Sequence, residues 1–320
     1  MNAHRHILWL PAMALALAIA TTAQAQTWPT KPVRIVAAFP PGTPGDVIAR
    51  LIQPVLQAVW KQAVIVDNKP GAAGNIAAAD VAQAKDDHTL LVGPDTVFTI
   101  NPHLYKKLGF DPRQALKPLT YLASFNQLLV CHPATGVTTL SKFIQLPATS
   151  TYASGGAGSP SHMTMEMLLN ATHAKQVHVP YKGPGPAAQD VLAGHIGCGF
   201  IVSSVVLAHV QSNRLTAIAV SGQERSVQLP AVPTVAESGY AGFDATFFET
   251  LMAPAGLPAA LAEKIQRDVR AALTTPAMQA RLAEMDLRVV AGTPQESEKR
   301  SREDFEKWAS IARKTQLQLD

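Results

Sequence analysis

Two segments of this chain, far apart in the sequence, share one design: a β-prone run, a loop of small residues and then a helical pattern. The first comprises Val33–Ala38, a loop over residues 39–46 and the helix-like Val47–Trp60. The second comprises a short run from Thr151, a glycine-rich loop and an amphipathic pattern that begins at Pro160. Small residues allow close approach of the backbone to a ligand, and N–H groups at a helix start bind anions. Two such units predict two lobes that hold one small anion.

Strand-like and helix-like segments alternate along the rest of the chain. In the first half, the helical pattern of Asp46–Trp60 is followed by the strand candidate Ala63–Val66, the Ala-rich helix candidate Asn75–Ala84 and the strand candidate Leu90–Val92. This βαβαβ order predicts a mainly parallel, doubly wound α/β sheet with right-handed crossovers. Ligands of such sheets bind at the carboxyl ends of the strands, where both glycine-rich loops lie.

A second βα series begins at Leu128–Cys131. Helices are expected after Ser159, Pro184 and Ser203, and the Pro- and Gly-containing stretch Gln228–Gly242 is expected to be a return linker. The further strand candidates of this series are Thr151–Ala153, Val177–Val179, Gly199–Val202 and Leu215–Val220.

The C-terminal third has a helical pattern, and the N-terminal capping residues of two of its helices can be identified from the sequence. Thr275-Pro276 and Thr293-Pro294 each place an N-cap threonine before a proline at the first helical position. Glu296 completes a capping box with Thr293.

The N-terminal 25 residues have the features of a secretory signal peptide. A weakly basic start precedes the apolar run Ile7–Ala20 and the small-x-small site Ala23-Gln24-Ala25, so cleavage is expected after Ala25. The formal net charge of +4 falls to +3 when Arg5 is removed with this segment. This excess of positive charge is small and dispersed, and no basic cluster lies among aromatic residues. Both features argue against a nucleic-acid partner.

Cys131 and Cys198 are the only cysteines of the chain. Export permits a disulfide, but two cysteines do not make a disulfide framework. Both lie in apolar stretches, and we expect buried free thiols in preference to a bridge. Neither has a metal-ligand partner at motif spacing, and no cofactor motif is present, so no metal and no cofactor are predicted.

The two loops and a series of shorter motifs resemble the solute receptors of tripartite tricarboxylate transporters, the Bug family. The first binding loop of the family matches Phe39-Pro40-Pro41-Gly42 with Asp46, and the second matches Tyr152, Ser154, Gly156, Gly158, Ser159 and His162. The other matching segments, in order, are Trp28–Arg34, Asp67–Ile76, Asn101–Tyr105, Val179–Gly183, Pro233–Gly239 and Ala253–Gly256.

The resemblance implies a periplasmic receptor with a type II-like periplasmic-binding-protein fold, whose two α/β lobes close on a small carboxylate. Lobe 1 would comprise residues 26–124 with 249–320, and lobe 2 would comprise 125–248, with crossovers near 124 and 249. The receptor would deliver its ligand to an inner-membrane permease of one large and one small subunit. A monomer is the default state of such receptors.

The residues of the second loop permit more than one role. Ser154, Gly156, Gly158 and Ser159 are candidates to donate N–H and hydroxyl groups to a carboxylate, while a β-turn with an N-cap is the structural alternative. His162 is a candidate either to contact the ligand or to brace the loop.

The first loop and two neighbouring strands supply the remaining candidates. Gly42, Thr43 and Gly45 are candidate backbone contacts, and Asp46 is expected to cap or brace the loop in preference to contacting an anion. Further candidates lie beside predicted strand ends, with core packing or exposure as alternatives: Phe39, Thr96, Tyr181 and Lys182.

Four departures from the family pattern affect the expected ligand. Thr43 and Gly45 alter the glycine pattern of the first loop, and Pro44 lacks an N–H donor there. Ile201 replaces an aspartate that is frequent in the family, which disfavours ligands that carry an amino group. Glu249 would repel an anion if it faced the cleft.

Two other functions share this pattern. A secreted hydrolase would use Ser154 or Ser159 with His162, but neither serine lies in a Gly-x-Ser-x-Gly motif, and we predict no enzyme. A receptor that docks a signalling partner would require the same ligand-driven closure as a transport receptor.

Overall fold

The computed structural model describes residues 28–315 and 317–319. The predicted signal peptide lies outside the described residues. Within them, no helix has both the length and the apolar character that crossing a bilayer requires.

The first lobe is built on three parallel strands, β1 (Val33–Ala37), β2 (Val64–Asn68) and β3 (Thr89–Pro94), with β1 in the middle. The helix α2 (Pro44–Trp60) connects β1 to β2, and α3 (Asn75–Ala82) connects β2 to β3. All of β3 is buried, as expected for a strand covered by helices on both faces. The βαβαβ prediction for this part of the chain is confirmed.

The second lobe repeats this arrangement. Its strands β5 (Thr151–Ser154), β6 (Val177–Pro180) and β7 (Cys198–Val202) are parallel, with β5 in the middle. The connecting helices α8 (Pro160–Thr172) and α9 (Pro184–Leu192) follow β5 and β6. The remaining segments of this lobe are η2 (Pro133–Thr135), α7 (Leu140–Ile144), α10 (Ser203–Gln211) and β8 (Thr216–Val220).

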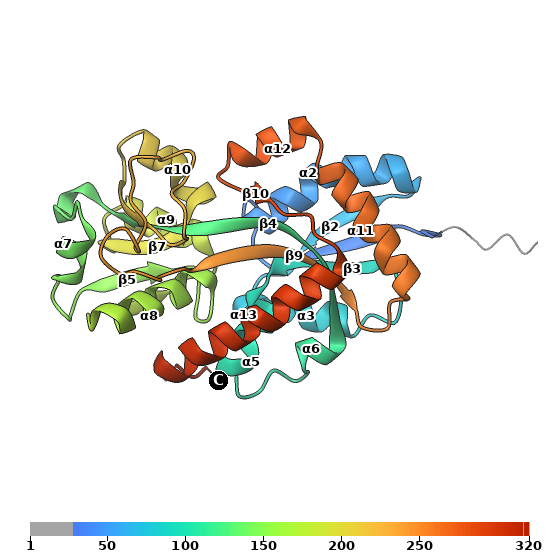
Figure 1. The fold of residues 1–320 in the computed structure, drawn as a ribbon, viewed down its shortest axis with the longest axis horizontal. Helices are drawn as coiled ribbons and strands as arrows, with labels where there is room; N and C mark the ends of the chain where they lie inside the picture. The colour runs from blue at the N-terminus through green and yellow to red at the C-terminus, as the bar shows by residue number, and fades with distance from the viewer. Residues whose placement is uncertain (1–27, 316, 320) are drawn as a thin grey trace, which may run out of the picture.

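Two long antiparallel strands join the lobes. β4 (Leu116–Cys131) pairs with β9 (Thr246–Pro254) as far as Asn126, and from Gln127 onward it pairs with β7 and β8. β9 also pairs with β3 of lobe 1. Figure 1 shows both strands running between the two lobes. The sequence predicted only the last part of β4, because Pro118 and several polar residues interrupt the apolar pattern before it.

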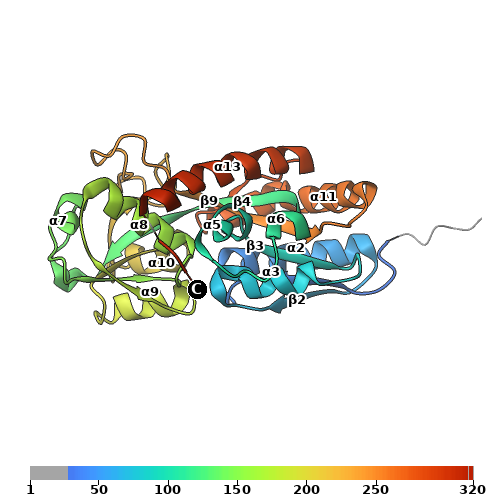
Figure 2. The same ribbon diagram turned by 90° about the horizontal axis from the view of Figure 1, so that it is seen from below.

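The C-terminal segment returns to lobe 1 and covers the crossover. Thr275 and Thr293 cap α12 (Pro276–Ala283) and α13 (Pro294–Thr315), and the predicted capping box is confirmed, since the Thr293 N–H bonds to Glu296 Oε2 at 2.7 Å. The helix α13 packs along β4 and reaches α8 of lobe 2 (Figures 1 and 2). The other elements of lobe 1 are η1 (Ala72–Gly74), α4 (Thr96–Thr99), α5 (Asn101–Leu104), α6 (Pro112–Ala115), α11 (Ala259–Leu273) and β10 (Arg288–Val289).

One apolar core runs through the crossover from lobe to lobe. Phe247 of β9 stacks on Phe125 of β4 and on Trp308 of α13, with ring centroids 5.9 and 5.2 Å apart. All three side chains are buried. This aromatic stack fixes α13 against the two strands that connect the lobes.

The expectation of free thiols is wrong: Cys131 and Cys198 form a disulfide. Cys131 ends β4, Cys198 begins β7, and the two residues are directly opposite in the antiparallel register, with Cα atoms 4.0 Å apart. The sequence does not reveal this pairing, because β4 and β7 are separated by two βα units along the chain.

Replacing both cysteines by serine is expected to lower the free energy of unfolding by about 2–5 kcal/mol, because the bridge closes a long loop of the unfolded chain. Denaturant unfolding of the double variant and of the reduced wild type measures this loss. Equal stability of the oxidised, reduced and double-serine proteins would contradict it.

Candidate functional site

A small cavity of about 40 Å³ lies where the two lobes meet. The starts of α2 and α8 both contribute to it, through Pro44 from lobe 1 and Pro160 from lobe 2. A cavity of this size has room for a few water molecules. The other lining residues are Phe39, Thr43, Pro94, Phe125, Gln127, Gly155, Ser159, Ser161, Pro184, Val202 and Glu249.

The first loop is held from within by Asp46. This buried carboxylate accepts hydrogen bonds from the Gly42 N–H, from Arg50 Nε and from Asn68 Nδ2, each at 2.9 Å. Its oxygens are directed at the loop and at β2, and Asp46 is absent from the cavity lining. Gly42, at φ +84°, makes the turn that brings its N–H to this carboxylate.

Phe39 and Thr43 are the first-loop candidates that line the cavity. Thr43 Oγ1 donates to the Pro40 carbonyl at 2.8 Å, which fixes the turn before α2. The N–H of Gly45 is directed at the carboxyl of Glu249. A large part of the donor capacity of the first loop is therefore used within the protein.

In the second loop, hydroxyl groups surround the start of α8. Ser159 caps the helix, with its Oγ accepting from the His162 N–H at 3.4 Å. Ser161 Oγ accepts from the Gly155 N–H at 2.8 Å and lies 3.0 Å from Ser159 Oγ. Sequence reasoning missed Ser161 and Gly155 as cavity residues, although both lie within the loop that it singled out.

Ser154 lies beneath the loop and outside the cavity lining. Its side chain is fully buried, with Oγ 2.6 Å from His178 Nε2 and accepting from the Gly156 N–H at 3.1 Å. Gly156 adopts φ +127°, a conformation that favours glycine. Ser154 thus fixes the backbone that leads to the cavity.

His162 braces the same loop. Its Nδ1 accepts a hydrogen bond from the Gly158 N–H at 3.0 Å, and its ring stacks on His178 with centroids 3.8 Å apart. Burial lowers the pKa of His162 to about 3, with a smaller contribution from His178, and burial lowers the pKa of His178 to about 4. Both rings are therefore neutral at neutral pH, which leaves Nδ1 of His162 free to accept.

Three further candidates lie away from the cavity. Tyr181 donates its hydroxyl to Asp190, Lys182 is exposed, and Thr96 is fully buried at the start of α4. Lobe 1 instead contacts the second loop through Tyr105, whose hydroxyl donates to the Ala157 carbonyl at 3.2 Å.

Glu249 of β9 lines the cavity, and only 4% of it is exposed. Burial raises the pKa of this carboxyl to about 8, while the Gly45 N–H acts in the opposite direction. Glu249 is therefore mostly protonated at neutral pH, so that it carries no charge to repel an anion. Its Oε2 has no hydrogen-bond partner among the described residues.

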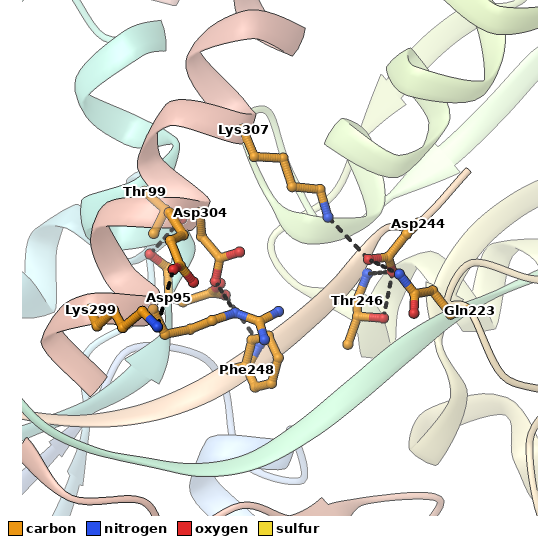
Figure 3. A network of polar contacts seen from close by, with 11 residues as sticks. Asp95, Thr99, Gln223, Asp244, Thr246, Phe248, Lys299, Asp304 and Lys307 are labelled. Atoms are coloured by element: carbon orange, nitrogen blue, oxygen red, sulfur yellow. Dashed lines mark hydrogen bonds and ion pairs between the residues drawn. The ribbon is translucent and has the colours of Figure 1, made fainter. Parts of the chain in front are cut away.

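A polar network behind the cavity links lobe 1, β9 and α13 (Figure 3). Buried Asp95 exchanges hydrogen bonds with the Phe248 backbone, with its N–H 2.8 Å from the Phe248 carbonyl oxygen. Burial, followed by the charge of Asp304, raises the pKa of Asp95 well above its usual range. Asp304 is held by Arg300 at 2.8 Å, and the Arg300 guanidinium lies 4.4 Å from the centre of the Phe248 ring.

The same helix also reaches the segment that enters β9 from lobe 2. Lys307 Nζ of α13 lies 3.2 Å from Asp244 Oδ2, and Figure 3 shows the two side chains directed toward each other. Asp244 in turn accepts from the N–H and hydroxyl of Thr246 at 3.0 and 2.7 Å. The helix α13 therefore contacts both Asp244, just before β9, and Phe248, within β9.

No cluster of three or more His, Cys, Asp or Glu side chains suited to a metal ion occurs in the part of the chain that the structure describes. The residues that line the cavity include one threonine, two serines, two phenylalanines and one glutamic acid.

Glu249→Gln is expected to raise the free energy of unfolding by on the order of 3 kcal/mol at pH 7, because only the wild type must keep this carboxyl protonated above its unfolded pKa. Because the pKa of Glu249 is higher in the folded than in the unfolded protein, the wild type loses stability as pH rises from about 4.5 to about 8. The stability advantage of Glu249→Gln should therefore vanish near pH 4. Thermal unfolding at pH 4 and pH 8 measures it.

Glu296→Gln serves as the matched control, because Glu296 is exposed and the Thr293 backbone N–H lowers the pKa of its carboxyl. A Glu249→Gln protein that melts below the wild type at pH 8 would contradict the burial of a neutral carboxyl.

Comparison with known proteins agrees with this architecture. The family model described as "Tripartite tricarboxylate transporter family receptor" matches residues 48–317. The chain is 30% identical over 307 residues to Protein BugT of Bordetella pertussis, covering 94% of each chain.

Three solved structures, one of them the periplasmic binding protein BugD, are similar over nearly the whole fold. R. palustris Rpa4515, solved with adipate, has a TM-score of 0.87 at 27% identity, with 91% of this chain and 99% of that chain covered. BugD has a TM-score of 0.85 at 26% identity, covering 91% and 99%. MatC of Rhodopseudomonas palustris, with bound malate, has a TM-score of 0.83 at 27% identity, covering 89% and 99%. The chain belongs to the family of tripartite tricarboxylate transporter receptors.

Proposed function

We propose that this protein is a periplasmic receptor that captures a small carboxylate between its lobes. The observation that carries the proposal is the convergence of two helix starts, those of α2 and α8, on one cavity at the junction of the lobes. Positive helix ends and hydroxyl donors favour an anion at this point. Adipate and malate in Rpa4515 and MatC support a ligand of the same chemical class.

The lobes of the receptor comprise residues 26–124 with 249–320 and residues 125–248. They open and close by bending where β4 changes partners, between Asn126 and Gln127, and where β9 crosses beside it. Support comes from the register of β4, which pairs with β9 on one side of this point and with β7 and β8 on the other. Opening is required for entry, because the cavity has room for only a few water molecules.

Within the site, Ser159 and Ser161 contact the carboxylate through their hydroxyl groups, while Phe39 and Phe125 pack against its carbon chain. Ser154, Gly156, Gly158 and His162 hold the second loop, and Gly42 and Asp46 hold the first. This division follows from the cavity lining and from the hydrogen bonds described above.

The protein acts outside the cytoplasm, after cleavage of the signal peptide behind Ala25. The disulfide supports this location, because disulfides persist in oxidising compartments such as the periplasm. The receptor is a monomer that delivers its ligand to a permease of one large and one small subunit in the inner membrane, and the family match supports such a partner.

The receptor catalyses no reaction. Of the hydrolase candidates, Ser154 faces His178 outside the cavity, and the Nδ1 of His162 accepts from the Gly158 N–H. Ser159 lines the cavity but acts as a helix cap. This arrangement supports binding without a nucleophile and its base.

A thermal-shift screen of the mature protein against adipate and malate, with their diesters as controls, tests the function. We expect the melting temperature to rise with an acid and not with its ester, since only a ligand of the folded state stabilises it. Turnover of an ester without any response to acids would overturn the receptor assignment.

Gly45→Ala is expected to weaken binding of that acid on the order of tenfold, because overpacking disturbs the site. An added Cβ would lie 2.7 Å from Glu249 Oε2 and 3.2 Å from Val92 Cγ1. Gly185→Ala is the matched control, since its Cβ would meet no atom within 4 Å. Isothermal titration of both variants measures the difference, and equal affinities would remove the α2 start from the site.

A further inference from the structure

Glu249 is a buried carboxyl group at the one place where an anion is expected. It lines the cavity beside Thr43 and Ser159, and its Oε2 lacks a hydrogen-bond partner among the described residues. A buried polar group without a partner is costly, so such a group is usually completed by a ligand or water. Oε2 lies beside Gly45 at the start of α2, and because Glu249 also lines the cavity, a ligand there can approach its carboxyl group.

The protonation state of Glu249 decides which partner it accepts. A carboxylate accepts hydrogen bonds only, whereas a carboxylic acid has one O–H to donate. Burial raises the pKa of Glu249 to about 8, and no lysine or arginine among the described residues forms an ion pair with it. At neutral pH it therefore presents a donor to the cavity.

We propose that Glu249 determines specificity in this receptor by donating its carboxyl proton in a hydrogen bond to a carboxylate of the ligand. The inference rests on the proposed function, since it assigns one residue of the carboxylate site. An O–H···O⁻ bond is short and strong because one partner is ionised. A buried carboxylic acid that stays neutral at pH 7 can serve as such a donor.

The charged groups on the neighbouring strands do not supply this donor. On β3, Pro94 is opposite Glu249 and is followed by Asp95, whose own pKa is raised by burial. On β4, Ala123 is opposite Glu249, and Lys117 lies near the other end of β9, opposite Ala253. The ionisable group next to Glu249 in this register is thus another acid, which supplies no positive charge to hold Glu249 ionised.

The helices packed against β9 carry charges that are already paired. On α2, Asp46 is bonded to Arg50 at 2.9 Å, and on α3, Asp80 is paired with Arg34 and Lys69, both at 2.9 Å. The residues that lobe 2 contributes to the cavity are uncharged. The pKa values of His162 and His178, about 3 and about 4, keep both rings neutral above pH 6.

The proposal predicts that the dissociation constant for a carboxylate ligand rises as pH rises. Adipate and malate are fully ionised above pH 6.5, since carboxyl groups titrate near pH 4. Only the protonated receptor is competent, and its fraction falls to about 3% at pH 9.5, so the dissociation constant should rise about 30-fold from pH 6.5 to pH 9.5. A ligand ammonium group on an ionised Glu249 would produce the opposite slope.

Isothermal titration of adipate and malate at these two pH values tests the inference with three proteins. Glu249→Gln keeps a neutral N–H donor that does not titrate, so it should bind more weakly than the wild type at pH 6.5, and its affinity should change less than about threefold between pH 6.5 and pH 9.5. Asp95→Asn, which removes the neighbouring acid, should retain a marked loss of affinity at pH 9.5.

Wild-type binding that is independent of pH, that strengthens with pH, or that loses the same 30-fold in Glu249→Gln would overturn the role of Glu249 and leave carboxylate binding intact. Absence of binding by the wild type to any carboxylate at either pH would overturn the proposed function itself.

Wild-type titrations at pH 8.5 in two buffers of different ionisation enthalpy add a test that does not depend on the variant. Uptake of about 0.8 proton per bound ligand is expected from a free-state pKa near 8. Zero uptake would contradict the proposal.

Discussion

The pairing of β4 with β9 is the constraint on which the rest of the structure depends. These antiparallel strands belong to both lobes, and they carry the buried Phe125 and Phe247 pair through the crossover. Because the core is continuous here, the lobes cannot separate without bending these strands. Glu249 and Gln127 of the cavity lie on these two strands, and most of the other lining residues lie in the loops after β1 and β5 or at the starts of the helices that follow them.

The helix α13 adds a second constraint across the same crossover. Trp308 stacks on Phe247, Arg300 covers Phe248, and Lys307 reaches Asp244. Apolar contacts and ion pairs thus hold one helix against both strands. In the proposed function, a short crossover held in this way confines motion of the lobes to a few residues of β4 and β9.

The cavity combines donors of three kinds around a low-polarity space. In the proposed function, the positive ends of two helices, the hydroxyl groups of Ser159 and Ser161, and Glu249 as long as it remains protonated are the neutral groups that face the anion. Recognition by neutral donors requires no buried cation, whose desolvation would be costly. The histidines beneath the second loop are also neutral, because burial lowers their pKa values. The Nδ1 atom of His162 can therefore accept a hydrogen bond from the Gly158 N–H.

The sequence alone determined the βα order of both lobes, the two loops, the helix caps at Thr275 and Thr293, and the family, because these depend on local patterns. Tertiary structure decided what depends on pairing between distant segments. The register of β4 against β7 formed the disulfide, β5 against β6 turned Ser154 toward His178, and β9 against β3 buried Glu249 at the cavity. A local pattern does not encode which strand lies beside which, and burial, which removes the expected negative charge of Glu249, exists only after these distant segments pair.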